Sequence, residues 1–391
     1  MFVRENQRID IIIPTYRAHK TLSRTLDSIK AQNILQDLDI LVVDDACPEG
    51  NYRDTVDFFS QFMKVRTIRL AENSGPGQAR QHGIDATKNP YFTCIDADDT
   101  FCADNALENL RRVLDEDKNI QCCSGSFVRL DKNGDEGIIC KDNMVSMDGK
   151  IYRRAFIERY DIRFNHTRAN EDTGYNMLVK LLCDNPKEQI KFLPETVCHV
   201  HYSASSMTQN NDAQFLWDQG FCGLIDNAIW AIDTARSYRP FSLAITPEIF
   251  RGLVTCYIYC SVISERKPIF AAQAWEYAKK FYHRCYKKFY RPSYKNLERH
   301  LASMTSDKIF EEAAKIHSAT WLKNFVPPMT LAEFLERLSA ESYDENQIYE
   351  VWAEMNKSPE MKNFIRSNEL TGVCPKGYAD FLTRGEGIGA P

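Results

Sequence analysis

The chain has 391 residues, a length that allows about two or three domains and a substantial core. It is 43% hydrophobic and 26% charged, with a net charge of −5, which is the composition of an ordinary soluble globular protein. This mild acidic balance argues neither for nor against a polyanionic partner, and any basic surface must be local. No apolar run approaches the ~18 residues needed to span a bilayer. The stretch Met1–Asn6 lacks the apolar core of a signal peptide, and we expect a cytoplasmic protein.

The cysteines argue against a disulfide or zinc framework. There are 13 of them, an odd number, and no Cys-x-x-Cys pair occurs. Cys122 and Cys123 are adjacent, and Cys256 and Cys260 are four positions apart. Irregular spacing of this kind predicts reduced and mostly buried thiols.

Strand-like and helical patterns alternate along the first part of the chain. Strands are expected over residues 9–13, 39–43, 65–70 and 91–95, with helices over 21–30, 56–62 and 78–87 between them. A helix over 105–115, a strand over 122–130, a helix over 152–160 and an amphipathic helix opened by Asn170–Thr173 extend the same domain. The alternation predicts an α/β fold with a doubly wound, mostly parallel sheet.

The pattern changes after about residue 211, where helical periodicity and many aromatic residues replace the alternation. We therefore expect a catalytic α/β domain over residues 1–210 and a mainly helical C-terminal domain over 211–374. That second domain would serve acceptor binding or self-association into a homo-oligomer. The Gly-rich end, 375–391, reads as a mobile tail.

Three acids follow the strand expected over residues 91–95. If Asp96 and Asp98 continue an extended backbone, they point to the same side. Two carboxylates that converge repel each other unless a hard divalent cation lies between them, and Mg²⁺ or Mn²⁺ prefers oxygen ligands. The alternative is a plain loop in which Asp99 caps the next helix.

Polar residues also end the first two strands, as Pro14-Thr15-Tyr16 and Asp44-Asp45. Doubly wound sheets bind ligands beyond the carboxyl ends of their strands, so these groups and the Asp96 segment should meet in one crevice. Asp45 could accept hydrogen bonds from a base or a ribose, and Tyr16 could stack on a base. Equally, each could be an ordinary turn or packing residue.

Three further segments are ambiguous by residue type alone. The loop Asn73–Gly77 offers backbone N–H groups to phosphates, with Arg80 as a cation, or is simply a turn. Glu171 and Asp172 open a helix, either as capping acids or as a general base. His201 could complete a metal site with Asp98 or be a structural histidine.

Five of these motifs stand in the order and approximate spacing of one enzyme family. They are Ile11–Tyr16, Val42–Asp45, Asn73–Gly75 with Ala79-Arg80, Asp96–Asp99 and Asn170–Asp172. Each is weak alone, but the ordered set is specific. Over about the first 210 residues the chain resembles the family 2 glycosyltransferases, which are inverting, nucleotide-sugar-dependent enzymes with the Rossmann-like GT-A fold.

The resemblance implies roles for the candidate residues. The donor, most often a uridine diphosphate (UDP) sugar, would be held by Pro14, Thr15, Tyr16, Asp45, Arg80, Asp96 and Ala97. Mn²⁺ or Mg²⁺ would be bound by Asp98 and Asp96, with His201 as a further ligand. Asp172 would be the catalytic base, with Glu171 beside it as the second catalytic candidate. His201 with Ser205–Thr208 is also similar to the family's closing segment near the diphosphate.

The resemblance also bears on the acceptor. Family members mostly decorate cell-envelope glycans, lipids or proteins, which would place the chain in the cytoplasm or at the inner membrane surface. Processive members carry Gln-x-x-Arg-Trp and flanking membrane helices. This chain shows neither, so we expect a non-processive enzyme that transfers one or a few sugars.

A basic and aromatic stretch over residues 279–299 raises a second possibility. Its cations are Lys279, Lys280, Arg284, Lys287, Lys288, Arg291, Lys295 and Arg299, interleaved with aromatic residues. Such a pattern can bind a phosphate backbone and stack bases, or it can be a helix with solvated lysines. The runner-up function is therefore glycosylation of a hydroxymethylated base in DNA, as in bacteriophage, within a host cytoplasm. A non-catalytic nucleotide-sugar binding module and a nucleotidyltransferase are the remaining alternatives.

Overall fold

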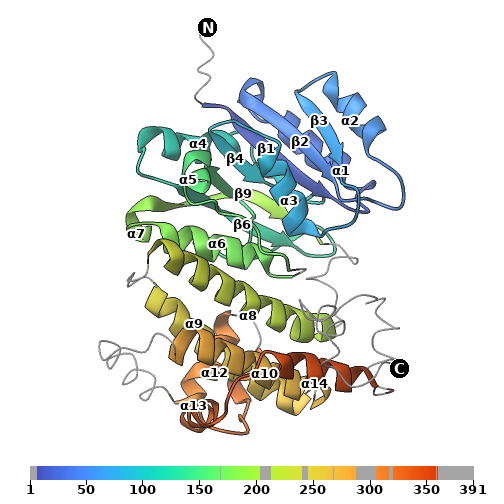
Figure 1. Cartoon of the computed structure of the whole chain (residues 1–391). Coiled ribbons are helices and arrows are strands. Elements are labelled where there is room, and N and C mark those ends of the chain that lie inside the picture. Colours follow the sequence, from blue (N-terminus) through green and yellow to red (C-terminus); the bar gives the residue numbers. More distant parts are fainter. Residues whose placement is uncertain are drawn as a thin grey trace. The chain divides into compact units, whose positions relative to one another are not determined.

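The computed structural model describes residues 7–167, 169–202, 213–239, 245–266, 268–287, 305–316, 320–357 and 359 (Figure 1). The chain divides into two compact units. The first comprises Met1–Asp212 and Thr234–Phe241, and the second comprises Ala213–Asp233 and Ser242–Pro391.

The first unit is built on a sheet that has nine strands in the described part of the chain. These are β1 (Ile9–Thr15), β2 (Leu38–Asp44), β3 (Val65–Arg69), β4 (Tyr91–Cys94), β5 (Thr100–Phe101), β6 (Cys122–Leu130), β7 (Glu136–Cys140), β8 (Lys150–Arg153) and β9 (Ile190–Val200). Their order is β3-β2-β1-β4-β8-β6-β9-β5, with β7 paired to β6 outside this path.

The strands β3, β2, β1 and β4 are parallel neighbours, in register Ile11 to Ile40 and Ile11 to Thr93. The second half of the sheet is mixed. There β8 is antiparallel to both β4 and β6, β9 is parallel to β6, and β5 and β7 make antiparallel pairs. The predicted α/β sheet is confirmed, and its parallel half brings the carboxyl ends of β1, β2 and β4 to one edge.

Helices cover the sheet because its strands are apolar on both faces. The helices are α1 (Leu22–Lys30), α2 (Arg53–Ser60), α3 (Pro76–Asp85), α4 (Ala106–Glu116), α5 (Arg154–Arg159), α6 (Glu171–Leu182) and α7 (Pro186–Gln189), with a 3₁₀ turn, η2, at Leu35–Asp37. One core cluster joins alternate residues of β1, such as Ile11 and Ile13, to Leu26 of α1 and Leu110 of α4.

The helix expected over residues 152–160 is found as α5, but it begins two residues later than predicted. Residues Tyr152 and Arg153 belong to β8, and only the following six residues form α5, because Tyr152 pairs with Phe92 of β4 and with Cys122 of β6. The acids after β4 do not continue a strand either. The strand ends at Cys94 and the chain turns, with the Asp99 N–H donating to the Asp96 carbonyl at 3.0 Å.

The second unit is helical throughout its described residues. Its elements are α8 (Ala213–Tyr238), which extends into the first unit, α9 (Ile245–Arg266), η3 (Pro268–Phe270), α10 (Ala271–Phe281), the π-helical turn η4 (Tyr282–Tyr286), α12 (Ser306–Ile316), η7 (Thr320–Asn324), α13 (Leu331–Ala340) and α14 (Asn346–Lys357). Buried aromatic residues on α9 and α10, among them Tyr257 and Phe281, make its core. Among the described helices, none is both long and apolar enough to cross a membrane.

The basic and aromatic stretch lies in this unit, and the structure describes its residues 279–287. Lys279 is buried and lies 2.7 Å from Glu276, Lys280 lies 2.8 Å from Asp226, and Arg284 lies 2.7 Å from Asp233. Phe281 and Tyr282 are buried. These members therefore form an ion-paired helix with inward aromatics, whereas Lys287, the remaining described lysine of the stretch, is exposed. Lys288, Arg291, Lys295 and Arg299 lie outside the described residues, as do Ser205–Thr208 and the tail 375–391.

The described cysteines form no disulfide among themselves, and most of them are buried.

Candidate functional site

The candidate site lies at the carboxyl ends of β1, β2 and β4, where parallel pairing places the segments after each strand at one edge of the sheet. Pro14 and Thr15 end β1 and are buried, and the Thr15 hydroxyl donates to the Val43 carbonyl at 2.9 Å. Tyr16 follows with 44% of its surface exposed. An exposed ring at this edge can stack on a flat ligand, whereas Pro14 and Thr15 act by shaping the backbone.

Asp45 follows β2 and holds the loop before α3. Its Oδ1 accepts the Ser74 N–H at 2.8 Å, and its Oδ2 accepts the Gly75 N–H at 2.9 Å and the Asn73 side-chain amide at 3.1 Å. Gly75 has φ of +85°, a conformation that favours glycine. The expectation that these N–H groups point to phosphates is therefore wrong for Ser74 and Gly75, whose donors are used by Asp45.

Arg80 joins three elements of the site. It lies buried on α3, and its guanidinium donates to Glu171 Oε1 on α6 at 2.8 Å and to Asp96 Oδ1 after β4 at 2.6 Å. Burial opposes the charged form, but the carboxylates of Asp96 and Glu171 prevail and hold the pKa of Arg80 well above its usual value. The structure thus brings Arg80, Asp96 and Glu171 into one network, although they come from distant parts of the sequence.

A group of three carboxylates meets beside this network. One oxygen from each of Asp96, Asp99 and Asp148 lies within 4.8 Å of the other two. Asp148 comes from the segment just before β8 and was missed by the sequence analysis. No motif marks it; its proximity follows from the pairing of β8 with β4, which brings residues before β8 to the end of β4.

The acids in this region raise one another's pKa values. Burial, and then the neighbouring Asp96 charge, raise the pKa of Asp98 to about 6 and that of Asp148 to about 6. Burial, together with Asp148 and Asp96, raises the pKa of Asp99 well above its usual value. A set of close oxygen ligands that repel one another is suited to a hard divalent cation such as Mn²⁺ or Mg²⁺.

Positive charge near the acids is limited. Lys150 is fully buried, its Nζ lies 3.2 Å from the Asp148 carbonyl, and burial lowers its pKa. The Arg24 guanidinium donates to the Asp98 carbonyl at 2.7 Å. The carboxylates of Asp96, Asp98, Asp99, Asp148, Glu171 and Asp172 outnumber these cations and Arg80. The chemistry of the donor set therefore fits a bound cation.

His201 lies against the acids through its backbone. Its N–H donates to Asp99 Oδ1 at 2.9 Å, and its ring Nε2 lies 3.0 Å from the Thr100 hydroxyl. Burial lowers the pKa of its imidazole to about 4, so the ring is neutral at pH 7. Among the described residues, the groups of close metal-ligand atoms do not include His201. The observed geometry supports a role in positioning Asp99.

Glu171 and Asp172 occupy the first turn of α6. Asn170 precedes them in a left-handed conformation, with φ of +58°, and its side chain makes no capping hydrogen bond to the helix. Burial, and then the charge of Glu171, raise the pKa of Asp172 to about 7. Burial also raises the pKa of Glu171. A partly exposed carboxyl group that titrates near neutrality can exchange a proton with a bound hydroxyl.

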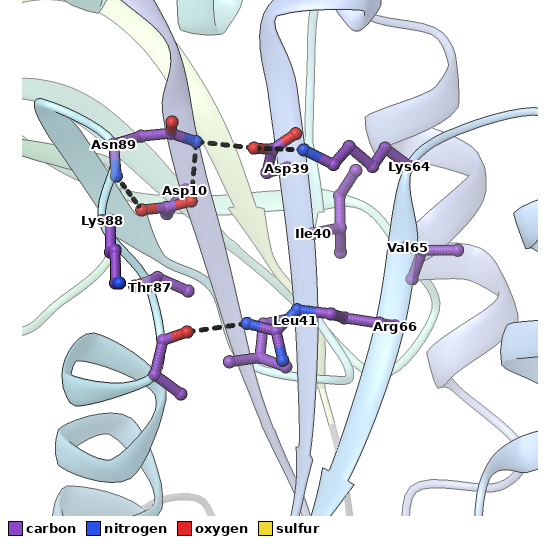
Figure 2. Close-up of a pocket in the computed structure, with 11 residues that line it drawn as sticks. Asp10, Asp39, Ile40, Leu41, Lys64, Val65, Arg66, Thr87, Lys88 and Asn89 are labelled. Carbon is purple, nitrogen blue, oxygen red and sulfur yellow. Dashed lines mark hydrogen bonds and ion pairs between the residues drawn. The ribbon is translucent and has the colours of Figure 1, made fainter.

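A separate cavity of about 260 Å³ opens at the opposite edge of the sheet, where β1, β2 and β3 begin (Figure 2). Asn89 donates there to Asp10 and to Asp39, each at 2.8 Å, and Lys64 lies 2.8 Å from Asp39. This cavity contains none of the predicted site residues. The acids at the carboxyl ends remain the stronger candidate, since α/β sheets place their ligands there.

Comparison with known proteins identifies the domain. Residues 10–170 match the family model described as glycosyl transferase family 2. These residues form a family 2 glycosyltransferase domain. The family 2 domain includes every candidate site residue up to Asp148, while Glu171, Asp172 and His201 follow its matched range.

The chain is also similar to individual glycan-polymer enzymes, among them the following two. A teichoic acid poly(glycerol phosphate) polymerase of Staphylococcus epidermidis is 29% identical over 171 residues, which is 40% of this chain and 24% of the relative. A poly(ribitol-phosphate) beta-glucosyltransferase of Bacillus spizizenii is 31% identical over 183 residues, 44% of this chain and 29% of the relative. The match thus spans less than a third of the length of either relative.

A solved structure shares the fold over most of the chain. A structure of S. aureus TarS 1-349 in complex with UDP-GlcNAc superposes with a TM-score of 0.61 at 14% identity, and covers 86% of this chain and 93% of that one. At this identity the likeness concerns the fold, and it confirms the predicted GT-A architecture with a helical C-terminal region.

Proposed function

We propose that the chain transfers a sugar from a UDP-sugar to an acceptor hydroxyl in a single inverting displacement. The observation that carries the proposal is the network of Arg80, which links the acid pair of α6 to the acids after β4 through hydrogen bonds of 2.8 and 2.6 Å. These acids share the edge where sheets of this type bind ligands. The TarS complex with UDP-GlcNAc, of the same fold, supports the choice of donor.

The nucleoside part of the donor would lie against Tyr16, with the buried Asp45 fixing the adjacent loop. Asp96, Asp99 and Asp148, whose ligand atoms lie within 4.8 Å of one another, would hold Mn²⁺ or Mg²⁺, with Asp98, which lies outside this group, as a further ligand. When bound, such an ion supplies positive charge that stabilises the departing diphosphate. Arg80, held between two carboxylates, would orient Asp96 and keep Glu171 in place.

Asp172 would serve as the general base. The acceptor oxygen forms a bond to the anomeric carbon as the bond from that carbon to the diphosphate breaks, and the acceptor proton passes to the Asp172 carboxylate. A pKa of about 7 suits this role, because about half of the carboxyl groups are then ionised at pH 7 and the carboxylate is basic enough to hold a proton.

We propose a polyol-phosphate polymer or a related cell-envelope glycan as the acceptor. The names of the two relatives, both of which concern such polymers, support this choice. The described part of the basic and aromatic stretch offers less support for DNA, since Lys279, Lys280 and Arg284 are each paired with an acid and only Lys287 adds an exposed lysine. The helical unit would contribute to acceptor binding or self-association.

A screen of UDP-sugars with Mn²⁺ tests the proposal. Release of UDP, rising on addition of poly(ribitol phosphate) or poly(glycerol phosphate), is expected with at least one donor. Release of pyrophosphate instead would indicate nucleotidyl transfer. If no donor is turned over and UDP does not bind, the proposed activity is wrong. Hydroxymethylated DNA serves as the comparison acceptor, and transfer to it alone would favour the DNA-modifying alternative.

A further inference from the structure

A second group of metal-ligand atoms lies outside the acidic site. It consists of the His19 imidazole, the Cys47 thiol and the Glu49 carboxylate, whose ligand atoms all lie within 4.8 Å of one another. His19 belongs to the segment between β1 and α1, and the other two to the segment between β2 and α2. We propose that these three residues bind a borderline-soft divalent cation, of which Zn²⁺ is the best match.

The observed spacing needs little adjustment to bind the ion. Tetrahedral zinc with bonds of about 2.3 Å to sulfur and about 2.0 Å to nitrogen or oxygen places its ligand atoms roughly 3.3–3.6 Å apart. The ligand atoms, which lie no more than 4.8 Å apart, must therefore approach one another by at most about 1.5 Å. His19 and Glu49 are exposed, and the His19 ring packs against the Tyr52 ring with their centroids 4.4 Å apart, whereas Cys47 is buried and supplies the fixed ligand.

The segment that carries Cys47 is held firmly by its own hydrogen bonds. The Cys47 N–H donates to Asp44 Oδ1 at 2.9 Å, while Arg69 donates to the Cys47 carbonyl at 3.0 Å and to the Gly50 carbonyl at 3.1 Å. Ala46, just before Cys47, has φ of +52°. Non-glycine residues in this region store strain, and such positions concentrate at functional sites.

The chemistry of the group selects a different ion from that of the acidic site. The acids around Asp96 offer oxygen alone, whereas this group offers nitrogen, sulfur and oxygen. Thiolate and imidazole ligands favour zinc over magnesium or manganese. Thiolate and carboxylate together also neutralise the charge of the ion.

Arg17 contacts two of the three ligand residues. The Arg17 N–H donates to the Cys47 sulfur at 3.4 Å, and the Arg17 guanidinium lies 3.8 Å from Glu49. That ion pair is largely exposed and costs little to release. Three protein ligands leave one tetrahedral position for water or for a ligand group.

A bound ion would link the segment after β1, which carries Tyr16, to the segment after β2, which carries Asp45. It would thereby brace two loops of the proposed donor site without belonging to the acidic site. The inference does not depend on the proposed glycosyl transfer, because it rests on the ligand group alone.

Titration of the purified full-length chain with Co²⁺, followed by competition with Zn²⁺, tests the proposal. Cobalt bound by a thiolate gives a sulfur-to-metal charge-transfer band, which an all-oxygen site cannot produce. We expect the band in the wild type, in the Asp96→Asn variant and in the Cys140→Ser control, which removes a partly exposed thiol elsewhere in the chain. We expect Cys47→Ser to lose it and Zn²⁺ to displace it.

Substitutions of the two exposed ligands, His19 and Glu49, test the proposal even if Cys47→Ser misfolds. His19→Ala and Glu49→Gln should leave the circular dichroism spectrum unchanged and weaken Zn²⁺ binding at least ~10-fold. A loss of this size is the lower end of what is typical when a residue that only supports a metal ligand is replaced. No band at saturating Co²⁺ in the wild type would overturn the proposal. Retention of the band in a folded Cys47→Ser variant, or wild-type Zn²⁺ affinity in both exposed variants, would do so as well.

Discussion

Replacement of Arg80 by methionine should destabilise the first unit strongly. The change leaves the Glu171 carboxylate, whose side chain is 8% exposed, without its charged partner at 2.8 Å. Removing one member of a buried ion pair costs about 3–5 kcal/mol, because the other charge stays buried and uncompensated. Asp96 is 42% exposed and adds little, since water solvates it when the arginine is gone.

The expected loss corresponds to a fall in melting temperature of about 6–20 °C for a unit of this size, measured by thermal unfolding of the ligand-free protein. The matched control is Arg163→Met, which breaks a pair with Asp85 in which the two side chains are 48% and 44% exposed. We expect it to cost less than about 1 kcal/mol. The double variant Arg80→Met/Glu171→Met should regain much of the lost stability, because it buries no unpaired charge.

The pH dependence has a definite sign. Without Arg80, the pKa of Glu171 in the folded protein lies further above its value in the unfolded protein. At acid pH Glu171 is protonated in the folded and the unfolded protein alike, so the loss of Arg80 adds no cost from an unpaired Glu171 charge. This cost to the free energy of unfolding grows as the pH rises through the folded-state pKa of Glu171. The Arg80→Met deficit should therefore shrink toward pH 4. A deficit no larger than that of Arg163→Met, or a double variant no more stable than the single one, would refute the buried network.

Three further predictions follow from the site. Asp172→Asn should retain UDP affinity in calorimetry and slow transfer at least ~10²-fold, as for a lost general base; wild-type rates would exclude Asp172 from that role. Because the pKa of Asp172 is raised to about 7, the wild-type rate should fall as the pH decreases below about 7, and a rate independent of pH from 5 to 8 would argue against the assignment. Gly77→Ala should destabilise the protein by about 1–3 kcal/mol in denaturant unfolding, because the new Cβ would lie 2.5 Å from Glu171 Cγ; unchanged stability would show that α6 can move away at no cost.

Much of the fold could be predicted from the sequence because its signals are local. The β-branched run Ile11–Ile13, stopped near Pro14, sets a buried strand and its end, and the same holds for the strand before Asp44. Helix periodicity between these strands predicts the parallel order. The segments that carry Asp45 and Asp96 therefore lie at the same edge of the sheet, beyond the carboxyl ends of the strands, as expected for such a sheet.

The remaining features depend on long-range contacts that no short pattern encodes. Asp148 reaches the acids because β8 pairs with β4, a pairing that the helical interpretation of Tyr152–Tyr160 concealed. The geometry at Asp96 was misjudged because the strand ends at Cys94 and turns. Arg80 was recognised as a cation, but its burial between Asp96 and Glu171 follows from the packing of α3 against both segments.

The most direct test of the central claim is calorimetric titration of UDP into the wild type and the Asp96→Asn variant, each with and without Mn²⁺. Asp135→Asn, which changes an exposed acid of the turn before β7, serves as the control. The account predicts that Mn²⁺ tightens UDP binding at least ~10-fold in the wild type and in the control, a coupling of about 1.4 kcal/mol, and that Asp96→Asn abolishes this gain. Equal UDP affinity with and without Mn²⁺ in the wild type, or an undiminished gain in Asp96→Asn, would contradict it.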